Sequence, residues 1–357
     1  MIFLHIIVII VLAFLSVDAF ILWGEWQSRI HIGRWQDRKQ WQMAVEGKAT
    51  AWLKHTPTVR LTNQHRLMLL DILSGKFRSD AIQTWQIAGL LLGLGQKRAE
   101  GYVKEHSDLF LGKEILPEDF LLAYVLKKHG QLTEEQERMI LDSCKDVKGA
   151  GTIYYRPWVK HIRFVDTLGM VLPFLHACGW DNLAKRQLEE YDQALLKDVF
   201  PAHAYDVEKD LPLGVFDWGR GMGWYILSLI ETVNMEGNAA RIVKLANALL
   251  PLQREDGGFS CFVFNQQERM ESTGTVLIGL LFVSAYQITH DKRFLESAFR
   301  VENALMKVTR RNGALDNCQG DTYGIGYYSQ IFSVMPFAQG LTLKLSKELD
   351  QYTDENA

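Results

Sequence analysis

Asp166 is the residue of this sequence best placed to exchange a proton with a bound molecule. It is the one acid in the apolar stretch 164–178 and stands at the start of that stretch. An acid in this position can cap a helix or complement its dipole. It can also lie at the mouth of a cleft, where apolar neighbours raise the pKa of the carboxyl group and make it a general acid.

Arg220 is the second candidate, because glycines surround it at positions 219, 221 and 223. Glycines let a backbone turn sharply or approach a ligand closely. The Arg220 side chain is therefore predicted to have few packing neighbours, which leaves its planar guanidinium free to bind a carboxylate. Phosphate binding fits the pattern less well, since no strand precedes the loop and no Lys-Ser or Lys-Thr follows it.

Aromatic and hydroxyl side chains accompany these two charges. Trp218 and Trp224 flank Arg220 and can stack on a sugar ring. His203, in the preceding loop, is either a hydrogen-bonded loop histidine or a catalytic one. The run 271–275, Glu-Ser-Thr-Gly-Thr, is either a hydroxyl-rich helix start or part of the same site.

Helical spacing dominates the chain that must position these residues. From about residue 62 onward, apolar residues recur at steps of three and four, and β-alternation is scarce. The predicted helices are 79–94, 120–128, one that opens at 133–136 with a capping-box pattern, 164–178, 182–198, 223–235, 239–253, 274–289, 293–310 and 327–349. The sequence therefore predicts an all-α fold of roughly ten to twelve helices.

The connections between these helices alternate in character. Short links such as 179–181 and 290–291 contrast with long loops rich in Gly, aromatic and polar residues, at 149–163, 199–222, 254–273 and 311–326. This contrast indicates helical hairpins closed into a ring, with the long loops at one mouth. An open α-solenoid is the alternative, but the sequence has no regular repeat of about 34 to 47 residues.

Composition excludes several classes of protein. The 357 residues are 48% hydrophobic and 23% charged, so the chain is neither disordered nor fibrous. A net charge of −3 gives no electrostatic footprint for nucleic acid. The four cysteines, at 144, 178, 261 and 318, form no CxxC pair, so we expect neither a zinc site nor a disulfide framework.

Residues 2–23 form a hydrophobic segment ahead of the predicted ring. As a helix the segment would span roughly 33 Å, enough for a bilayer core, so we interpret it as an uncleaved membrane anchor. A cleaved signal peptide, with small residues at 17–19, and a buried helix are the alternatives. The basic residues that follow favour a cytoplasmic body, whereas a signal peptide implies export, so the side of the membrane stays open. The predicted organisation is a hydrophobic segment at 1–24, a linker and first helix region at 25–60, and a barrel domain at 61–357.

The sequence around Arg220 resembles a known family. The string 217–224, Asp-Trp-Gly-Arg-Gly-Met-Gly-Trp, is similar to the Trp-Gly-Arg-Gly loop of the unsaturated glucuronyl and rhamnogalacturonyl hydrolases, glycoside hydrolase families 88 and 105. Segments 165–170 and 271–275 and the His203 loop resemble further motifs of these families, in the same chain order. Tyr327-Tyr328 followed by Gly340 resembles their last inner helix, and the resemblance covers roughly residues 80 to 345.

The resemblance implies an (α/α)6 barrel of six hairpins and an unusual reaction. Polysaccharide lyases leave a sugar with a C4=C5 double bond beside its carboxylate. The family hydrates this vinyl ether, and the resulting hemiketal opens and releases the aglycone. The match makes Asp166 the general acid and places His203, Arg220 and Trp224 in the pocket. It implies an acidic oligosaccharide as the substrate and no metal or organic cofactor.

The sequence departs from the family at its second carboxylate. The family has another aspartate upstream, near the start of a helix, and here Glu114 and Asp119 compete for that role. The Gly-Met-Gly at 221–223 also replaces a more polar pattern. Alternatives to the unsaturated uronyl hydrolase are a membrane-tethered, non-catalytic carbohydrate-binding protein of surface-polysaccharide assembly, and an ordinary glycosidase or an epimerase on the same barrel. An ordinary glycosidase needs two carboxylates that flank the bond.

Overall fold

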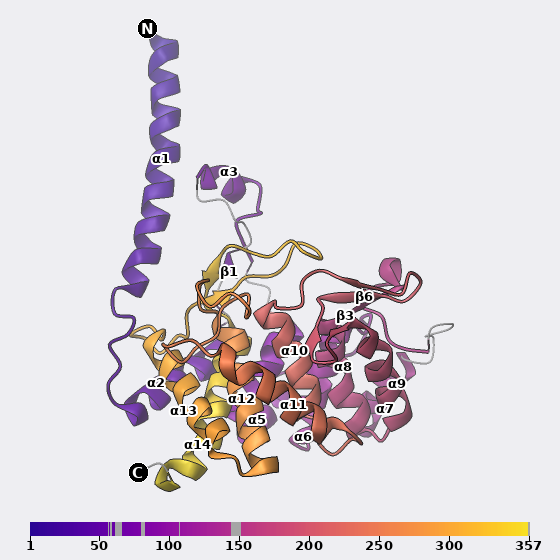
Figure 1. The fold of residues 1–357 in the computed structure, drawn as a ribbon. Helices are drawn as coiled ribbons and strands as arrows, with labels where there is room; N and C mark the ends of the chain where they lie inside the picture. Colours follow the sequence, from indigo (N-terminus) through magenta and orange to yellow (C-terminus); the bar gives the residue numbers. More distant parts are fainter. Residues whose placement is uncertain are drawn as a thin grey trace.

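One long helix, α1 (Ile2–Arg29), projects from a body of packed helices (Figure 1). The computed structural model describes residues 1–355, apart from 56, 58, 61–65, 80–82, 107 and 144–150. The helix predicted at 79–94 begins only at Thr84, because Ser79 lies in a strand, and residues 80–82 lie outside the described residues. The predicted domain boundary at residue 61 also lies outside them.

Six helices form a closed inner ring in which each helix packs on the next and the last packs on the first. They are α4 (Thr84–Leu94), α6 (Pro117–Lys128), α8 (Val165–Ala177), α10 (Gly219–Ile230), α12 (Ser272–Thr289) and α14 (Pro336–Leu349). Nearly every residue of these helices is buried, which explains why they are apolar on all sides.

A second set of helices surrounds this ring. They are α2 (Arg38–Lys54), α5 (Gln96–Glu105), α7 (Glu134–Ser143), α9 (Asp181–Tyr191), α11 (Asn238–Leu249) and α13 (Lys292–Lys307). Each is amphipathic and buries one stripe; in α13 the stripe includes Leu295, Ala298 and Val301. Outer and inner helices alternate along the chain in six pairs, and the predicted (α/α)6 barrel is confirmed.

The remaining elements are short and lie mostly in the connections. They include α3 (Met68–Leu73) and four 3-10 turns, at Pro157–Val159, Asp192–Ala194, Leu250–Leu252 and Asp350–Glu355. One antiparallel sheet has the order β3 (Ile162–Phe164), β6 (Ala204–Asp206), β7 (Leu211–Leu213). Three two-stranded pairs complete the set: β1 (Val59–Arg60) with β2 (Arg78–Ser79), β4 (Leu195–Leu196) with β5 (Phe200–Pro201), and β8 (Cys318–Gln319) with β9 (Phe332–Ser333).

Several helix boundaries differ from those predicted. The helix predicted at 223–235 begins at Gly219, so Arg220 lies in a first helical turn and not in a loop. The helix predicted at 182–198 ends at Tyr191, before the β4 strand. The helix predicted at 327–349 begins only at Pro336, because proline is tolerated in the first turn and not further inside a helix. Tyr327 and Tyr328 therefore lie in the loop before the last inner helix, whereas Gly340 lies within that helix.

Close contact between α4 and α14 closes the ring. A Cβ atom added at Gly93 would collide with the backbone oxygen of Gly340, and one added at Gly340 would collide with that of Gly89. The two helices can approach at this distance only because these positions carry no side chain. The glycines in this pair of helices therefore serve packing.

α1 (Ile2–Arg29) stands apart from the barrel and points away from it (Figure 1). None of its most apolar 18-residue window is buried, and by length and composition it could cross a membrane or act as a signal sequence. α12 passes the same test of length and composition, but it is 78% buried in the inner ring. Asp18 of α1 accepts hydrogen bonds from the Leu67 and Met68 amides, at 2.8 and 2.9 Å, and so fastens α3 beside α1.

Candidate active site

The N-terminal parts of α4, α6, α8 and α10, with two of the long loops, surround a cavity at one end of the barrel. The cavity has a volume of about 260 Å³. The long loops that precede α8, α10 and α14 lie at this same end, as the alternation of connections predicted. The residues that line the cavity are Gln83, Trp85, Glu118, Tyr155, Asp166, Met170, Arg220, Trp224, Asp321 and Thr322.

Asp166 is the second residue of α8, and its side chain is 22% exposed at the cavity wall. Burial raises the pKa of its carboxyl group to about 6, although the Arg220 guanidinium acts in the opposite direction. A carboxyl group with this pKa carries a proton in a substantial fraction of molecules near pH 6. It can therefore act as a general acid close to neutral pH.

The β3–β6 pairing brings His203 to Asp166. Phe164 pairs with Ala204, and the Val165 amide donates to the His203 carbonyl oxygen at 3.1 Å. His203 Nε2 then lies 3.8 Å from Asp166 Oδ2. Burial, reinforced by the charge of Arg220, lowers the pKa of His203 to about 4. The ring is thus neutral where Asp166 is ionised, and the contact is not an ion pair.

Arg220 lies in the first turn of α10 and is only 4% exposed. Its guanidinium donates to the Gln319 carbonyl oxygen at 2.8 Å, lies 3.6 Å from Asp321 Oδ1, and stands 5.2 Å from the centre of the Trp218 ring. The prediction that Arg220 lacks packing neighbours is therefore wrong, because α10 begins earlier than expected and turns the side chain inward. The guanidinium nevertheless remains part of the cavity wall.

The two tryptophans have different places. Trp224 lines the cavity, packs against Trp85, and has a buried indole N–H with no hydrogen-bond partner in the described structure. Trp218 is 2% exposed, and its ring centre lies 4.6 Å from that of His203. Its indole N–H donates to Gln319 Oε1 at 3.0 Å. Trp218 and His203 do not line the cavity. His203 instead contacts Asp166, and Trp218 contacts Arg220, on the side away from the cavity.

Glu118 and Asp321 are further carboxylates of the cavity wall, and the sequence predicted neither. Glu118 accepts from Arg156 at 2.6 and 3.2 Å and from the Tyr155 hydroxyl at 3.1 Å. Asp119 instead caps its own helix through the Leu116 amide and pairs with Lys113, while Glu114 is exposed. Pro117 is a signal for this arrangement: with proline at the first helical position, Asp119 falls at the third, where a capping acid belongs.

The segment 271–275 supports the site without lining it. Glu271 is fully buried and accepts from the Thr273 and Gly274 amides, as a helix cap does. It also accepts from the Gln319 amide at 3.0 Å. Because Gln319 in turn contacts Trp218 and Arg220, Glu271 holds the strand that positions the guanidinium.

No metal site is found among the described residues. No group of three or more His, Cys, Asp or Glu side chains in that part of the chain could hold an ion. Cys261 and Cys318 are free thiols, and Cys144 lies outside the described residues.

The fold is that of the unsaturated uronyl hydrolases of glycoside hydrolase families 88 and 105. A possible member of family 105 from Salmonella enterica serovar Paratyphi A matches with a TM-score of 0.67 and 16% identity, over 89% of this chain and 96% of that one. The unsaturated glucuronyl hydrolase of Bacillus sp. GL1 matches with a TM-score of 0.62 and 15% identity, over 87% and 97% of the two chains. A family 88 hydrolase from Bacteroides vulgatus matches with a TM-score of 0.63 and 13% identity, over 89% and 100%.

These similarities are structural only. No family model matches the sequence, and no curated protein matches it either. A polysaccharide lyase shares the fold as well, at 13% identity and a TM-score of 0.60. The shared fold therefore leaves the reaction to be argued from the residues of the cavity.

Proposed function

We propose that the protein is a glycoside hydrolase that acts on unsaturated uronyl oligosaccharides by hydrating their C4=C5 vinyl ether. The observation that carries this proposal is the pairing of two groups in one cavity wall. Asp166 offers a carboxyl group with a pKa of about 6, and Arg220 offers a buried guanidinium. A proton donor beside an anion-binding group matches a substrate whose double bond is conjugated to a carboxylate.

In the proposed reaction, Asp166 transfers its proton to C4 and a water molecule adds its oxygen to C5. One proton of that water returns to the Asp166 carboxylate, and the other stays on the new C5 hydroxyl group. The hemiketal at C5 then opens by breaking the bond to the ring oxygen. This leaves a hemiacetal at C1, which expels the aglycone as an alcohol.

The other cavity residues have binding roles in this proposal. Arg220 holds the substrate carboxylate, and the Trp224 indole N–H, buried without a partner, can donate to a sugar oxygen. Glu118 lines the same cavity and is held by Arg156 and Tyr155, and we assign it the role of orienting the attacking water. The neutral His203 ring supports Asp166 without adding a charge.

Turnover on a panel of lyase-generated oligosaccharides tests this function. Hydration removes the double bond, so ultraviolet absorbance should fall in step with release of the aglycone. The same oligosaccharides with a saturated terminal uronate serve as the control and should remain intact. Binding of the unsaturated compounds without any turnover would instead favour the non-catalytic carbohydrate-binding protein.

An ordinary glycosidase is the second candidate, because Glu118 and Asp166 line the same cavity. Two carboxylates across one cavity are what hydrolysis of a saturated glycoside requires. Cleavage of the saturated control at a rate equal to that of the unsaturated substrate would favour this reaction over hydration.

We also propose that α1 is an uncleaved membrane anchor. Its 28 residues rise roughly 42 Å, more than the roughly 30 Å of a bilayer core. Its large apolar side chains are exposed along most of its length, and Trp23 and Trp26 lie near its C-terminal end, where aromatic residues favour a membrane interface.

A further inference from the structure

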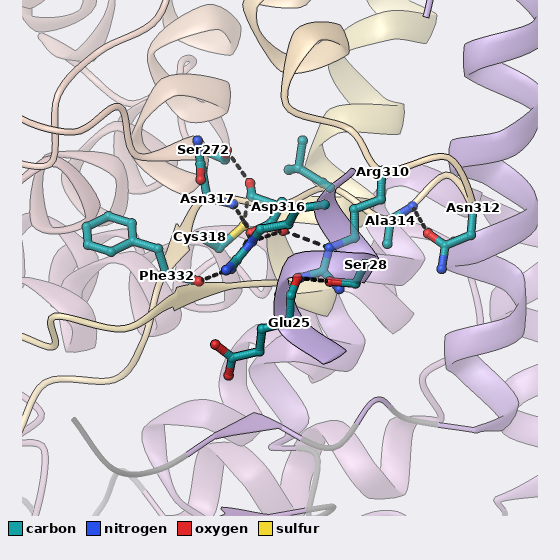
Figure 2. A network of polar contacts seen from close by, with 12 residues as sticks. Glu25, Ser28, Ser272, Arg310, Asn312, Ala314, Asp316, Asn317, Cys318 and Phe332 are labelled. Carbon is teal, nitrogen blue, oxygen red and sulfur yellow. Dashed lines mark hydrogen bonds and ion pairs between the residues drawn. The ribbon is translucent and has the colours of Figure 1, made fainter. Parts of the chain in front are cut away.

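The C-terminal end of α1 is fixed to the barrel by a buried ionic contact. Arg29 donates to both carboxylate oxygens of Asp316, at 2.8 and 3.1 Å, and to the Phe332 carbonyl oxygen at 2.5 Å. Arg310 donates to the same carboxylate at 2.7 Å, and the Asp316 side chain has no exposed surface (Figure 2). Two cations on one buried acid make this a firm attachment and not a flexible linker.

This attachment lies at the same end of the barrel as the candidate active site. Asp316 and Phe332 belong to the segment between α13 and α14 that also carries Gln319 and Asp321, the neighbours of Arg220. From this end α1 extends away from the ring, while the chain ends at the opposite face, after α14 (Figure 1). If α1 crosses a membrane, the mouth of the cavity therefore faces that membrane.

α3 lies beside α1 at the level of Asp18 and adds an apolar surface there. Leu67, Leu70 and Leu73 are each more than half exposed. From Asp18 to Arg29 the helix rises only roughly 16 Å, so α3 and the mouth are close in depth. Exposed leucines next to an exposed apolar helix form a continuous surface that suits the edge of a bilayer.

A large cavity lies between α1, α3 and the barrel. Its volume is about 980 Å³, and its wall is mainly apolar, with Phe20 and Ile21 of α1, Ile72 of α3 and Trp52 of α2. Three charged residues also line it: Lys48, Arg310 and Glu25. We refer to it as the α1 cavity. Its size and lining suit a hydrocarbon chain, and Lys48 can pair with a phosphate at the end of that chain, whereas Arg310 is already paired with Asp316.

A third cavity of about 210 Å³ lies between the α1 cavity and the candidate active site and shares wall residues with both. Ser333 and Val334 line both the α1 cavity and this third one. Asp321 and Thr322 line both the third cavity and the candidate active site. The three cavities thus follow one another along the segment 320–334, from the side of α1 to Asp166.

We propose that the substrate is an acidic glycan carried by a membrane lipid, with its lipid chain in the α1 cavity and its terminal sugar at Asp166 and Arg220. This inference rests on the proposed function and names the carrier of its substrate. The continuity of the α1 cavity with the exposed apolar surface of α1 and α3 explains how a lipid chain enters. The third cavity, which shares wall residues with the α1 cavity and with the candidate active site, takes the part of the glycan between the lipid chain and the terminal sugar.

Filling the α1 cavity tests the proposal. Gly24 lines this cavity, and a Cβ atom added there meets nothing within 4 Å, so Gly24→Leu places a side chain in the cavity without a collision. Gly47→Leu is the matched control, since Gly47 is also helical and open but lines none of these cavities. The full-length protein and both variants are reconstituted in phosphatidylcholine vesicles.

Two substrates are compared in these vesicles: an unsaturated uronyl disaccharide as a soluble glycoside, and the same disaccharide joined through phosphate to a long-chain alcohol. The wild-type protein should prefer the lipid-linked form. Gly24→Leu should lower kcat/KM for that form by roughly tenfold, the effect of excluding about two methylene groups, and leave the soluble form unchanged. Gly47→Leu should change neither. Equal rates on both forms, or no effect of Gly24→Leu, would overturn the proposal.

Lipid labelling separates a failure of this inference from a failure of the proposed function. A phospholipid with a photoactivatable acyl chain should label the peptide that contains Trp52, a cavity-lining residue of the barrel, in the wild type, and label it less in Gly24→Leu. If neither substrate is turned over, the proposed function fails, and the labelling still decides whether the α1 cavity takes lipid. Equal labelling of wild type and Gly24→Leu would show that it does not.

Discussion

At the scale of single residues, the proton of Asp166 is the feature on which the proposed chemistry depends. Asp166→Asn keeps the shape of the side chain but cannot release the proton, so activity should fall by about 10² to 10⁴. In the wild type the protonated form is the active one, and the pKa of Asp166 is about 6. The rate should therefore decline as the pH rises through about 6. A profile that rises over this range would contradict the assignment of Asp166 as the acid.

The same substitution has a predictable effect on stability. Burial raises the pKa of Asp166 above its ordinary value of 3.8, so the folded protein disfavours the ionised form. The stability that the protonated carboxyl group contributes is present below about pH 4 and is lost as the pH rises to about 6. Asp166→Asn should thus be as stable as the wild type at low pH, and more stable at pH 7 by at most about 3 kcal/mol. Urea unfolding at both pH values measures this, and a large loss of stability would indicate a helix-capping role.

Arg220 is the residue that should distinguish acidic from neutral ligands. Arg220→Lys keeps the charge but loses the planar fork, so an unsaturated uronide should bind more weakly by about 1–3 kcal/mol. The methyl ester of that uronide lacks the carboxylate and should lose much less. Titration of wild type and variant with both ligands measures the difference. Equal losses would mean that Arg220 serves only to hold Gln319 and the loop around it.

At the scale of elements, the sequence predicts which segments are helices better than where they begin. Periodicity predicts the ends of α6 and α8 to within a few residues. The capping contacts between Thr133 and Gln136 also form as expected. Periodicity fails at Gly219, because glycines in a first helical turn look like a loop when the packing around them is unknown. The prediction therefore placed Arg220 in a loop with few packing neighbours, whereas the residue lies buried in the first turn of α10.

The candidate site could be predicted only in part for the same reason. Asp166 could be predicted because it is the one acid at the start of an apolar helix, which the sequence alone shows. Glu118 lies in the first turn of α6, whereas Tyr155 and Asp321 lie in two separate loops, and the three meet only when the ring closes. Nothing local in the sequence marks such residues, apart from Pro117 as a guide to which acid caps the helix.

The contact between α4 and α14 gives a prediction at this scale. Gly93→Ala places a methyl group against the Gly340 backbone, and neither helix can move without opening the ring. The free energy of unfolding should fall by about 1–3 kcal/mol or more. Gly101→Ala in α5 is the control, since a Cβ atom there meets nothing within 4 Å; it should be neutral or gain about 0.5–1 kcal/mol. Chemical denaturation measures both, and equal effects would show that the contact is looser than described.

At the scale of the whole molecule, Arg29 of α1 and the residues that follow it, Trp35 and Arg38, hold the N-terminal part of the chain to the barrel. The residue at which the chain is truncated therefore decides which of these contacts are lost. A protein that begins at Gly33 loses Arg29 but keeps Trp35, whose indole donates to the Arg310 carbonyl oxygen. It also keeps Arg38, which donates to both oxygens of Glu302 at 2.7 and 2.9 Å. Asp316 stays paired through Arg310. A protein that begins at Gln40 loses the Arg38 contacts as well and leaves the acid of Glu302, 5% exposed, without that cation.

These differences predict three outcomes for the location and stability of the chain. The full-length protein should stay in the membrane fraction through high salt and an alkaline wash, because α1 is held by the bilayer and not by charge. The protein that begins at Gly33 should be soluble and folded. The protein that begins at Gln40 should have a free energy of unfolding about 1–3 kcal/mol lower than the protein that begins at Gly33. Breaking a fully buried ion pair costs roughly 3–5 kcal/mol, and the loss here is smaller because Arg38 is 28% exposed. Full-length protein recovered intact in the soluble fraction would contradict the anchor, and protein recovered shortened by the length of α1 would show a signal peptide instead.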